Sequence, residues 1–261
     1  MRLDVILKIF VFKMFNLFKK KEAAKSLHTI DVDYTSLKVD MHSHVLPGID
    51  DGAATPEDSI ILIRRMMELG ITKIIATPHI MADYYRNTAE TINAALDILK
   101  AELIKEGIDI SVSAAAEHYL DENFETLINT GKLMTMGDKF VLFELPFISV
   151  PSNLMQIIAK MRELGYKPIL AHPERYPYLK ISDFQTIRDY GCRLQLNTIS
   201  LTGYYGKQIK KMAEDLVDNK LLDFISSDMH HLRHADAFQH ALAMPYVQNL
   251  LESQVLKNST L

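Results

Sequence analysis

The chain has 261 residues, of which 48% are hydrophobic and 24% charged, a composition typical of a globular protein with one large domain or two small ones. Its formal net charge of -4 argues against a nucleic-acid-binding protein, and its single cysteine excludes an internal disulfide and a thiolate metal cluster. We therefore expect a cytoplasmic protein that does not bind nucleic acid.

The first 25 residues differ from the rest, because seven basic and two acidic side chains give them a net charge of +5. Their apolar stretch is interrupted by Lys8 and Lys13, so it is too short and too charged to span a bilayer. We expect residues 1–34 to be an N-terminal extension, either an interfacial helix on an anionic membrane surface or a dispensable tail, with Met14 as an alternative start. Residues 35–261 are expected to form the single folded domain, cytoplasmic or membrane-peripheral.

From residue 37 onward, short apolar runs alternate with amphipathic stretches. The expected strands cover residues 37–41, 71–77, 108–116, 140–143, 168–171, 192–196 and 222–226. The expected helices cover residues 55–69, 88–105, 154–164, 182–190 and 206–219. Strands that alternate with helices pair in parallel, so the chain is predicted to be an α/β protein. Seven such units can close into a barrel, whose active site lies at the carboxyl ends of the strands.

Side chains that bind metal ions occur where these strands end. His42 and His44 are two residues apart and point to the same side of a strand, and Asp228 and His230 repeat this spacing. The full set has five imidazoles and four carboxylates: His42, His44, Asp51, His79, Glu117, Glu144, His172, Asp228 and His230. All except Asp51, which lies in the loop after the first strand, are at strand ends. Because the strand ends of a barrel meet at one rim, we expect a single metal site.

This set exceeds what one four-coordinate ion needs, so we expect two or three divalent ions. Nitrogen and oxygen donors without sulfur favour manganese, iron or zinc over magnesium or calcium, without choosing among the three. Three divalent ions among four carboxylates keep a positive charge, which suits a dianionic phosphoryl group. Such a cluster supports hydrolysis, with a water that bridges the ions and has a lowered pKa as the nucleophile.

Several stretches together resemble one family. They are His42-Ser43-His44, Leu46-Pro47-Gly48-Ile49-Asp50-Asp51-Gly52, Thr77-Pro78-His79, Ala116-Glu117, Phe143-Glu144-Leu145-Pro146, Ala171-His172-Pro173-Glu174-Arg175-Tyr176 and Ser227-Asp228-Met229-His230. Over residues 37–251, the chain resembles the bacterial PHP-type (polymerase and histidinol phosphatase) tyrosine-protein phosphatases of capsule and exopolysaccharide operons. The resemblance implies a distorted seven-stranded parallel barrel and a three-metal site, with manganese as the first candidate. It also implies hydrolysis of phosphotyrosine on a cognate bacterial tyrosine kinase.

The resemblance further implies how the ligands are divided among the ions. Three groups are expected, of which the second shares its bridging carboxylate with the first: His42, His44, Glu117 and Asp228; Glu117, Glu144 and His172; and Asp51, His79 and His230. The N-terminal apolar and basic segment is not part of the family's pattern. The oligomeric state stays open.

Two arginines near these ligands are candidates for contact with phosphate. Arg175 follows His172 by three residues and Arg233 follows His230 by three, and a guanidinium offers a bidentate fork to phosphate oxygens. The alternatives are a salt bridge of Arg175 with Glu174 or a rim carboxylate, and a solvated loop charge for Arg233. The remaining histidines of the domain are expected on loops or helix surfaces: His118, His231, His234 and His240.

Other functions were weighed against a tyrosine phosphatase. A small-molecule phosphomonoesterase of the histidinol-phosphate type would use the same metal chemistry, whereas an amidohydrolase would want a lysine where this chain has Glu144. A non-catalytic, metal-stabilised kinase regulator would need fewer ligands. A cysteine-based phosphatase needs an arginine six residues after its nucleophile, and the corresponding position after Cys192 is Thr198.

Overall fold

The computed structural model describes residues 33–253 and 255–261. The expected interfacial helix lies outside these residues, and no helix within them is long and apolar enough to cross a membrane. Tyr34, which we assigned to the extension, is fully buried. Its ring stacks on Phe238 with 4.0 Å between centroids, and its hydroxyl donates to the Phe238 carbonyl at 3.0 Å. Tyr34 therefore belongs to the packed domain.

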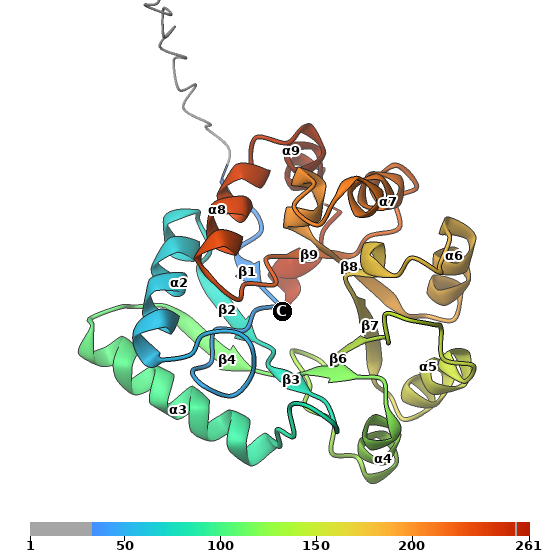
Figure 1. The fold of residues 1–261 in the computed structure, drawn as a ribbon, viewed down its shortest axis with the longest axis horizontal. Helices are drawn as coiled ribbons and strands as arrows, with labels where there is room; N and C mark the ends of the chain where they lie inside the picture. Colours follow the sequence, from blue (N-terminus) through green and yellow to red (C-terminus); the bar gives the residue numbers. More distant parts are fainter. Residues whose placement is uncertain (1–32, 254) are drawn as a thin grey trace, which may run out of the picture. The chain divides into compact units, whose positions relative to one another are not determined.

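Strands and α-helices alternate along most of the described chain (Figure 1). The strands are β1 (Val39–Asp40), β2 (Lys73–Ala76), β3 (His79–Ile80), β4 (Ser111–Ala114), β5 (Glu117–Tyr119), β6 (Phe140–Glu144), β7 (Lys167–Ala171), β8 (Arg193–Asn197) and β9 (Phe224–Ser226). The α-helices are α2 (Pro56–Glu68), α3 (Ala89–Lys105), α4 (Glu122–Thr130), α5 (Leu154–Glu163), α6 (Ile181–Asp189), α7 (Lys207–Asp218), α8 (Leu232–Ala241) and α9 (Pro245–Glu252). Short 3₁₀ helices are η1 (Pro173–Arg175), η2 (Thr198–Thr202) and η3 (Asn258–Thr260).

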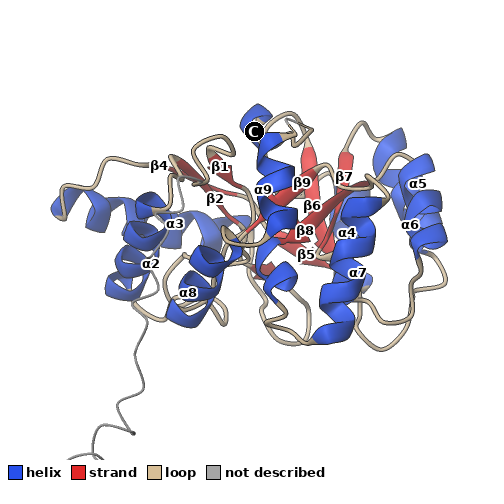
Figure 2. Cartoon of the chain, turned by 90° about the horizontal axis from the view of Figure 1, so that it is seen from above, coloured by secondary structure: helices blue, strands red, loops and turns tan. Residues whose placement is uncertain are grey.

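All strand pairs in the described part are parallel, as the alternating pattern predicts. They form a three-stranded sheet, β1-β2-β4, and a six-stranded sheet, β3-β5-β6-β7-β8-β9. The helices surround the strands (Figure 1), with α2 and α3 beside the smaller sheet and α4 to α7 beside the larger one (Figure 2). The side chains between helices and strands form the main hydrophobic core.

The pairing does not confirm a regular closed barrel of seven strands. The expected strands 71–77 and 108–116 contain only β2 and β4, and each is followed after two residues by an additional short strand, β3 or β5, that belongs to the other sheet. Pro78 lies at the first division and has no amide hydrogen to donate to a ladder. The neighbouring break leaves Ala115 and Ala116 outside the strands, although the amide of Glu117 still donates to the carbonyl of Pro78 at 3.1 Å.

Side chains join β1 to β9 where a backbone ladder is missing, and we call this junction the seam. Its only backbone bridge in the described chain pairs Ser43 with Met229. Below that bridge, the buried Asp40 carboxylate accepts hydrogen bonds from the Ser226 hydroxyl at 2.5 Å and the Ser227 amide at 2.8 Å. Buried Asn258 adds bonds to both strands. The seam therefore fixes the strands that precede the two pairs of predicted ligands.

Candidate metal centre

The structure brings the nine predicted ligands together in one cluster, although His79 and Glu117 begin β3 and β5 and do not end a strand. His42 and His44 follow β1, Asp228 and His230 follow β9, and His172 follows β7. The others lie in the loop after β1 or in three further strands: Asp51, His79, Glu117 and Glu144. Their donor atoms form four overlapping groups, within each of which all atoms lie within 4.8 Å of one another. The rule that parallel strands meet at one rim therefore correctly predicts that these side chains lie together.

Glu117 lies at the centre of the cluster. Its Oε2 is 3.1 Å from His42 Nε2 and 3.3 Å from His44 Nε2, whereas its Oε1 is 2.9 Å from His172 Nε2. Burial would raise the pKa of this carboxyl, but the imidazoles of His42 and His79 outweigh burial and hold the pKa well below its usual range. One ionised carboxylate thus faces imidazoles on two sides, which is the geometry expected of a bridging ligand.

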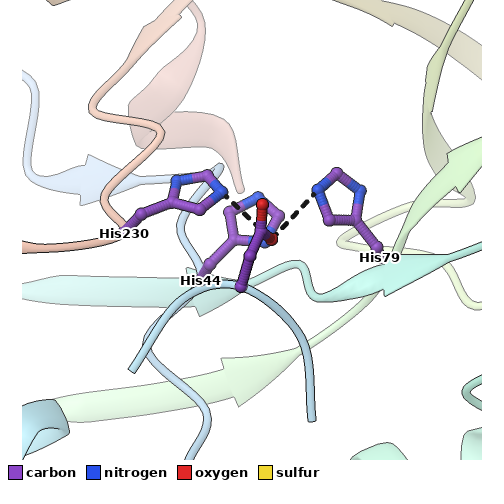
Figure 3. A group of neighbouring side chains, drawn as sticks. His44, His79 and His230 are labelled. Atoms are coloured by element: carbon purple, nitrogen blue, oxygen red, sulfur yellow. Dashed lines mark ion pairs between the residues drawn. The ribbon is translucent and has the colours of Figure 1, made fainter. Parts of the chain in front are cut away.

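His79 belongs to two of the groups, which differs from the expected division. Its Nε2 is 3.5 Å from Asp51 Oδ1, and the same oxygen is 3.6 Å from His230 Nε2. Figure 3 shows His44, His79 and His230 turned toward one another from separate segments. However, His79 Nδ1 is 3.3 Å from both Glu117 and Glu144. The ring therefore stands between the Asp51 group and the Glu117 group.

Asp228 is a second carboxylate close to the imidazoles of His42 and His44. Its Oδ1 is 3.3 Å from His42 Nε2 and 3.5 Å from His44 Nε2. Burial alone would raise the pKa of Asp228, but the charges of His42, His230 and Arg175 outweigh burial and lower the pKa far below its usual value. The carboxylates of Glu117 and Asp228 raise the pKa of His42 to about 9 despite the burial of its ring. A metal ion bound by His42 would therefore compete with a proton for this ring.

Two residues orient the first ligand pair, and sequence spacing did not single them out. Asp50 Oδ2 is 2.8 Å from His44 Nδ1, and Gln195 Oε1 is 2.9 Å from His42 Nδ1. Such contacts fix the tautomer and leave both Nε2 atoms free for an ion. The loop folds back closely, since a Cβ at Gly52 would lie only 2.0 Å from the His44 carbonyl oxygen. Glycine is therefore required there for Asp50 to reach His44.

Two ligands adopt a backbone conformation that is unusual for non-glycine residues. His172, the first residue after β7, has a φ angle of 30°, and Asp228, the second residue after β9, has one of 50°. Left-handed backbone at such residues typically costs about 1–3 kcal/mol and concentrates at functional sites. The strain falls where each strand must turn its next side chain toward the cluster.

The donor set fits divalent cations. His79 Nδ1 and His172 Nδ1 are buried without a hydrogen-bond partner in the described chain, although His79 Nδ1 is close to two carboxylates. A buried nitrogen that approaches two carboxylate oxygens without a hydrogen bond is placed as a metal ligand would be. The mixture of imidazole and carboxylate is also the one that first-row divalent ions prefer.

The cluster opens into a cavity of about 380 Å³. Arg175 lines it, and its NH1 is 3.1 Å from Asp228 Oδ2, so a rim carboxylate is its partner. Arg233 does not line this cavity but an adjacent one of about 430 Å³, which shares His230 and His231. The expectation that Arg233 contacts the phosphoryl group therefore finds no support in its position.

Two of the four histidines expected on loops or helix surfaces are buried instead, whereas His240 is exposed on α8 as expected. His118 is fully buried, and its Nδ1 is 3.2 Å from the Leu142 carbonyl oxygen. His234 is also buried and lines the metal cavity together with His231. Adjacency to a predicted ligand is thus informative here, because α8 begins two residues after His230 and places His234 in the lining of the same cavity.

This fold and site define a class of protein. It is the class of parallel α/β proteins in which imidazoles and carboxylates from several strands and their loops cluster at one site. Residues 38–256 match the family model described as "Capsular polysaccharide synthesis, CpsB/CapC". The tyrosine-protein phosphatase YwqE of Bacillus subtilis is 34% identical over 198 residues, which cover 75% of this chain and 78% of YwqE. The chain belongs to the CpsB/CapC family, which confirms the family resemblance seen in the sequence.

Further relatives agree with this assignment. CpsB of Streptococcus agalactiae, named a tyrosine-protein phosphatase, is 27% identical over 74% of this chain and 83% of its own length. A solved structure from a study of Bacillus subtilis YwqE and Streptococcus pneumoniae CpsB, described as "unique metal-dependent tyrosine phosphatases", matches with a TM-score of 0.72. It is 32% identical and covers 84% of this chain and 96% of that one. An organophosphorus hydrolase from Deinococcus radiodurans shares the fold at 13% identity and a TM-score of 0.51.

Proposed function

We propose that this chain is a metal-dependent protein-tyrosine phosphatase that acts on a tyrosine-phosphorylated protein, with a bacterial tyrosine kinase of capsule or exopolysaccharide synthesis as the expected substrate. One observation carries the proposal: nine residues with nitrogen and oxygen donors lie in one cluster, and seven of them line a cavity that also presents Arg175. The named activities of the YwqE and CpsB relatives support it. The finer fold assignment, a distorted seven-stranded barrel of the PHP type, belongs to the same proposal.

The proposed ligands are the nine side chains of the cluster, and two or three divalent ions, with manganese tested first and iron and zinc next, suit their chemistry. When bound, such ions lower the pKa of a water and offset phosphoryl charge. Glu117 is the proposed bridging carboxylate, because its two oxygens face different imidazoles. Asp50 and Gln195 hold the rings of His44 and His42 in place.

Arg175 supplies the phosphate contact that does not depend on a metal. Its side chain is 25% exposed within the cavity, and a guanidinium binds phosphate oxygens through a planar pair of N–H donors. A tyrosine leaving group has an ordinary pKa of about 10, far below that of an alkyl alcohol, so bond cleavage places little demand on a general acid. The residues of the cavity therefore need mainly to orient the phosphate and balance its charge.

The first test compares substrates and removes the metals. Purified protein with manganese should hydrolyse a phosphotyrosyl peptide faster than histidinol phosphate, and should leave an unactivated carboxylic ester intact. A chelator should abolish turnover, and added manganese or another divalent ion should restore it. Faster turnover of histidinol phosphate than of the peptide would indicate a small-molecule phosphomonoesterase. No turnover of any phosphate ester by metal-loaded protein would indicate a non-catalytic regulator.

Cys192→Ser is expected to retain wild-type turnover of the phosphotyrosyl peptide. Cys192 is buried, and burial raises the pKa of its thiol, so a thiolate nucleophile is not available. Position 198 carries a threonine instead of the arginine of a phosphate-binding loop. Loss of turnover in Cys192→Ser, with metal content and thermal unfolding unchanged, would contradict the metal mechanism.

Deleting residues 1–21 is expected to change membrane binding without changing catalysis. The deleted part contributes none of the proposed ligands, so turnover of a soluble peptide should stay within about twofold. If the segment is an interfacial helix, binding to vesicles of anionic lipid should fall, while binding to neutral vesicles stays low for both proteins. A truncated protein with full metal content and little turnover would show that the segment contributes to catalysis.

A further inference from the structure

Arg175 makes few polar contacts for a charged side chain in a cavity. Its NH1 donates to Asp228 Oδ2 at 3.1 Å, and no other side-chain hydrogen bond of Arg175 is found within residues 33–253 and 255–261. Nε and the second terminal nitrogen are therefore available to a ligand. One hydrogen bond does not define the plane of a long, flexible side chain, so other contacts must orient it.

Two aromatic rings make those contacts, and we call Phe147 and Tyr205 the aromatic clamp. Arg175 Cζ lies 5.0 Å from the centroid of the Phe147 ring and 5.1 Å from that of Tyr205. Both distances fall within the range of a cation–π contact. The rings come from different parts of the chain, the loop between β6 and α5 and the loop between η2 and α7. Both also line the metal cavity.

Each ring of the clamp is itself held by residues of the site. Phe147 stacks on the ligand His172 with 6.0 Å between centroids and on buried Tyr176 with 5.6 Å. This explains how a side chain that is 41% exposed keeps a defined position.

Tyr205 is tied to the ligand that pairs with Arg175. The Asn197 side chain donates to the Tyr205 hydroxyl at 3.3 Å and to Asp228 Oδ2 at 2.9 Å. Its backbone amide donates to buried Glu174 at 3.1 Å. The Tyr205 ring and the Arg175 guanidinium are therefore both connected to Asp228, the ring through Asn197 and the guanidinium directly.

We propose that the aromatic clamp positions Arg175 for the phosphoryl group, so that Phe147 and Tyr205 are positioning residues that act through the guanidinium. This inference rests on the proposed phosphatase function. A phosphate competes with Asp228 for the guanidinium of Arg175. Without the contacts from the two rings, the guanidinium would turn toward the carboxylates of the cluster. The two rings stabilise the charged guanidinium by cation–π contacts and do not add a competing anion. The N–H groups of Arg175 that have no partner in the described part of the chain therefore stay available to the substrate.

The experiment is a double-mutant cycle with two readouts. Phe147→Leu and Tyr205→Leu are made in the wild-type chain and in an Arg175→Ala chain. Each metal-loaded protein is assayed for kcat/KM on a phosphotyrosyl peptide and for inhibition by inorganic phosphate, which has no aromatic ring. Ile148→Ala is the matched control, because Ile148 lies in the same loop and is 94% exposed.

Removing either ring from the wild-type chain should lower kcat/KM by about threefold to thirtyfold, the range of a partly desolvated cation–π contact, and weaken phosphate inhibition similarly. In the Arg175→Ala chain, the same substitution should change both values by less than about twofold, because coupled residues are non-additive. Phe147→Tyr keeps an aromatic ring and should have the wild-type values of kcat/KM and phosphate inhibition. Tyr205→Phe keeps the ring without its hydroxyl and should retain most of both values. None of these substitutions should change the metal content.

Three results would overturn the inference. Equal losses in both backgrounds would show that the rings act independently of Arg175. Weaker peptide turnover with unchanged phosphate inhibition would show that they contact the substrate's aryl group instead. A lower metal content in Phe147→Leu would show that the ring supports His172. Failure of the phosphatase proposal is distinct, since the wild-type enzyme would then not hydrolyse the peptide at all.

Discussion

Glu117→Gln is expected to remove bound metal and to lower kcat/KM on a phosphotyrosyl peptide by about a thousandfold or more. Bound ions stabilise transition-state charge by roughly several kcal/mol, and about 1.4 kcal/mol corresponds to a tenfold change in rate. The substitution keeps the volume of the side chain but replaces the charged oxygens that lie near His42 and His172. Metal analysis and steady-state kinetics measure the two effects.

Glu122→Gln is the matched control, because Glu122 is an exposed carboxylate on α4, a few residues from Glu117. It should keep the wild-type metal content and turnover. Far-ultraviolet circular dichroism should show both variants folded. A Glu117→Gln protein that retains all its metal and most of its activity would rule out the proposed bridging role.

Arg175→Ala is expected to keep its metals and to lose turnover by about a hundredfold to a thousandfold, or about 3–4 kcal/mol, the usual cost of removing a donor that acts in the transition state. Metal should be retained because Asn197 still donates to Asp228 at 2.9 Å. Removing a nearby cation also lowers the repulsion that a metal ion would meet. Arg175→Lys should recover only part of the rate, since an ammonium keeps the charge without the planar fork.

His172→Ala distinguishes a metal ligand from a residue that contacts phosphate. His172 lies only three positions from Arg175, and its replacement should remove metal together with activity. Atomic emission measurements on the two purified variants make this comparison directly. Near-normal turnover in Arg175→Ala would mean that its ion pair with Asp228 is structural. Metal loss in Arg175→Ala would mean that the arginine maintains the ligand geometry.

The clustering of the candidate ligands could be predicted from the sequence because strand ends are easy to recognise. His79, Glu117 and His172 each lie where an apolar run stops, and parallel pairing brings such positions together whatever the details of the sheet. The division into two sheets was not predictable in this way. Hydrophobic periodicity marks where a chain is extended, but it does not report whether neighbouring extended segments keep their hydrogen bonds.

Residues that act through other side chains were the ones missed. Asp50 and Asp51 are adjacent, yet one orients His44 and the other faces His79, and only the folded loop distinguishes them. Gln195 and Asn197 lie on β8, whose ordinary pattern gave no sign of contacts with His42 and Asp228. Their roles depend on distances between strands, which residue spacing along one strand does not contain.

The seam between β1 and β9 links metal affinity to the integrity of the fold. His42 and His44 lie on one side of it, and Asp228 and His230 lie on the other. Local separation of the two strands pulls the ligand pairs apart, so a state with an open seam cannot hold the same ions. Any ligand that binds only the closed state stabilises that state in proportion to the logarithm of its concentration. Divalent ions bound by both ligand pairs would therefore act as a reversible cross-link between the two strands.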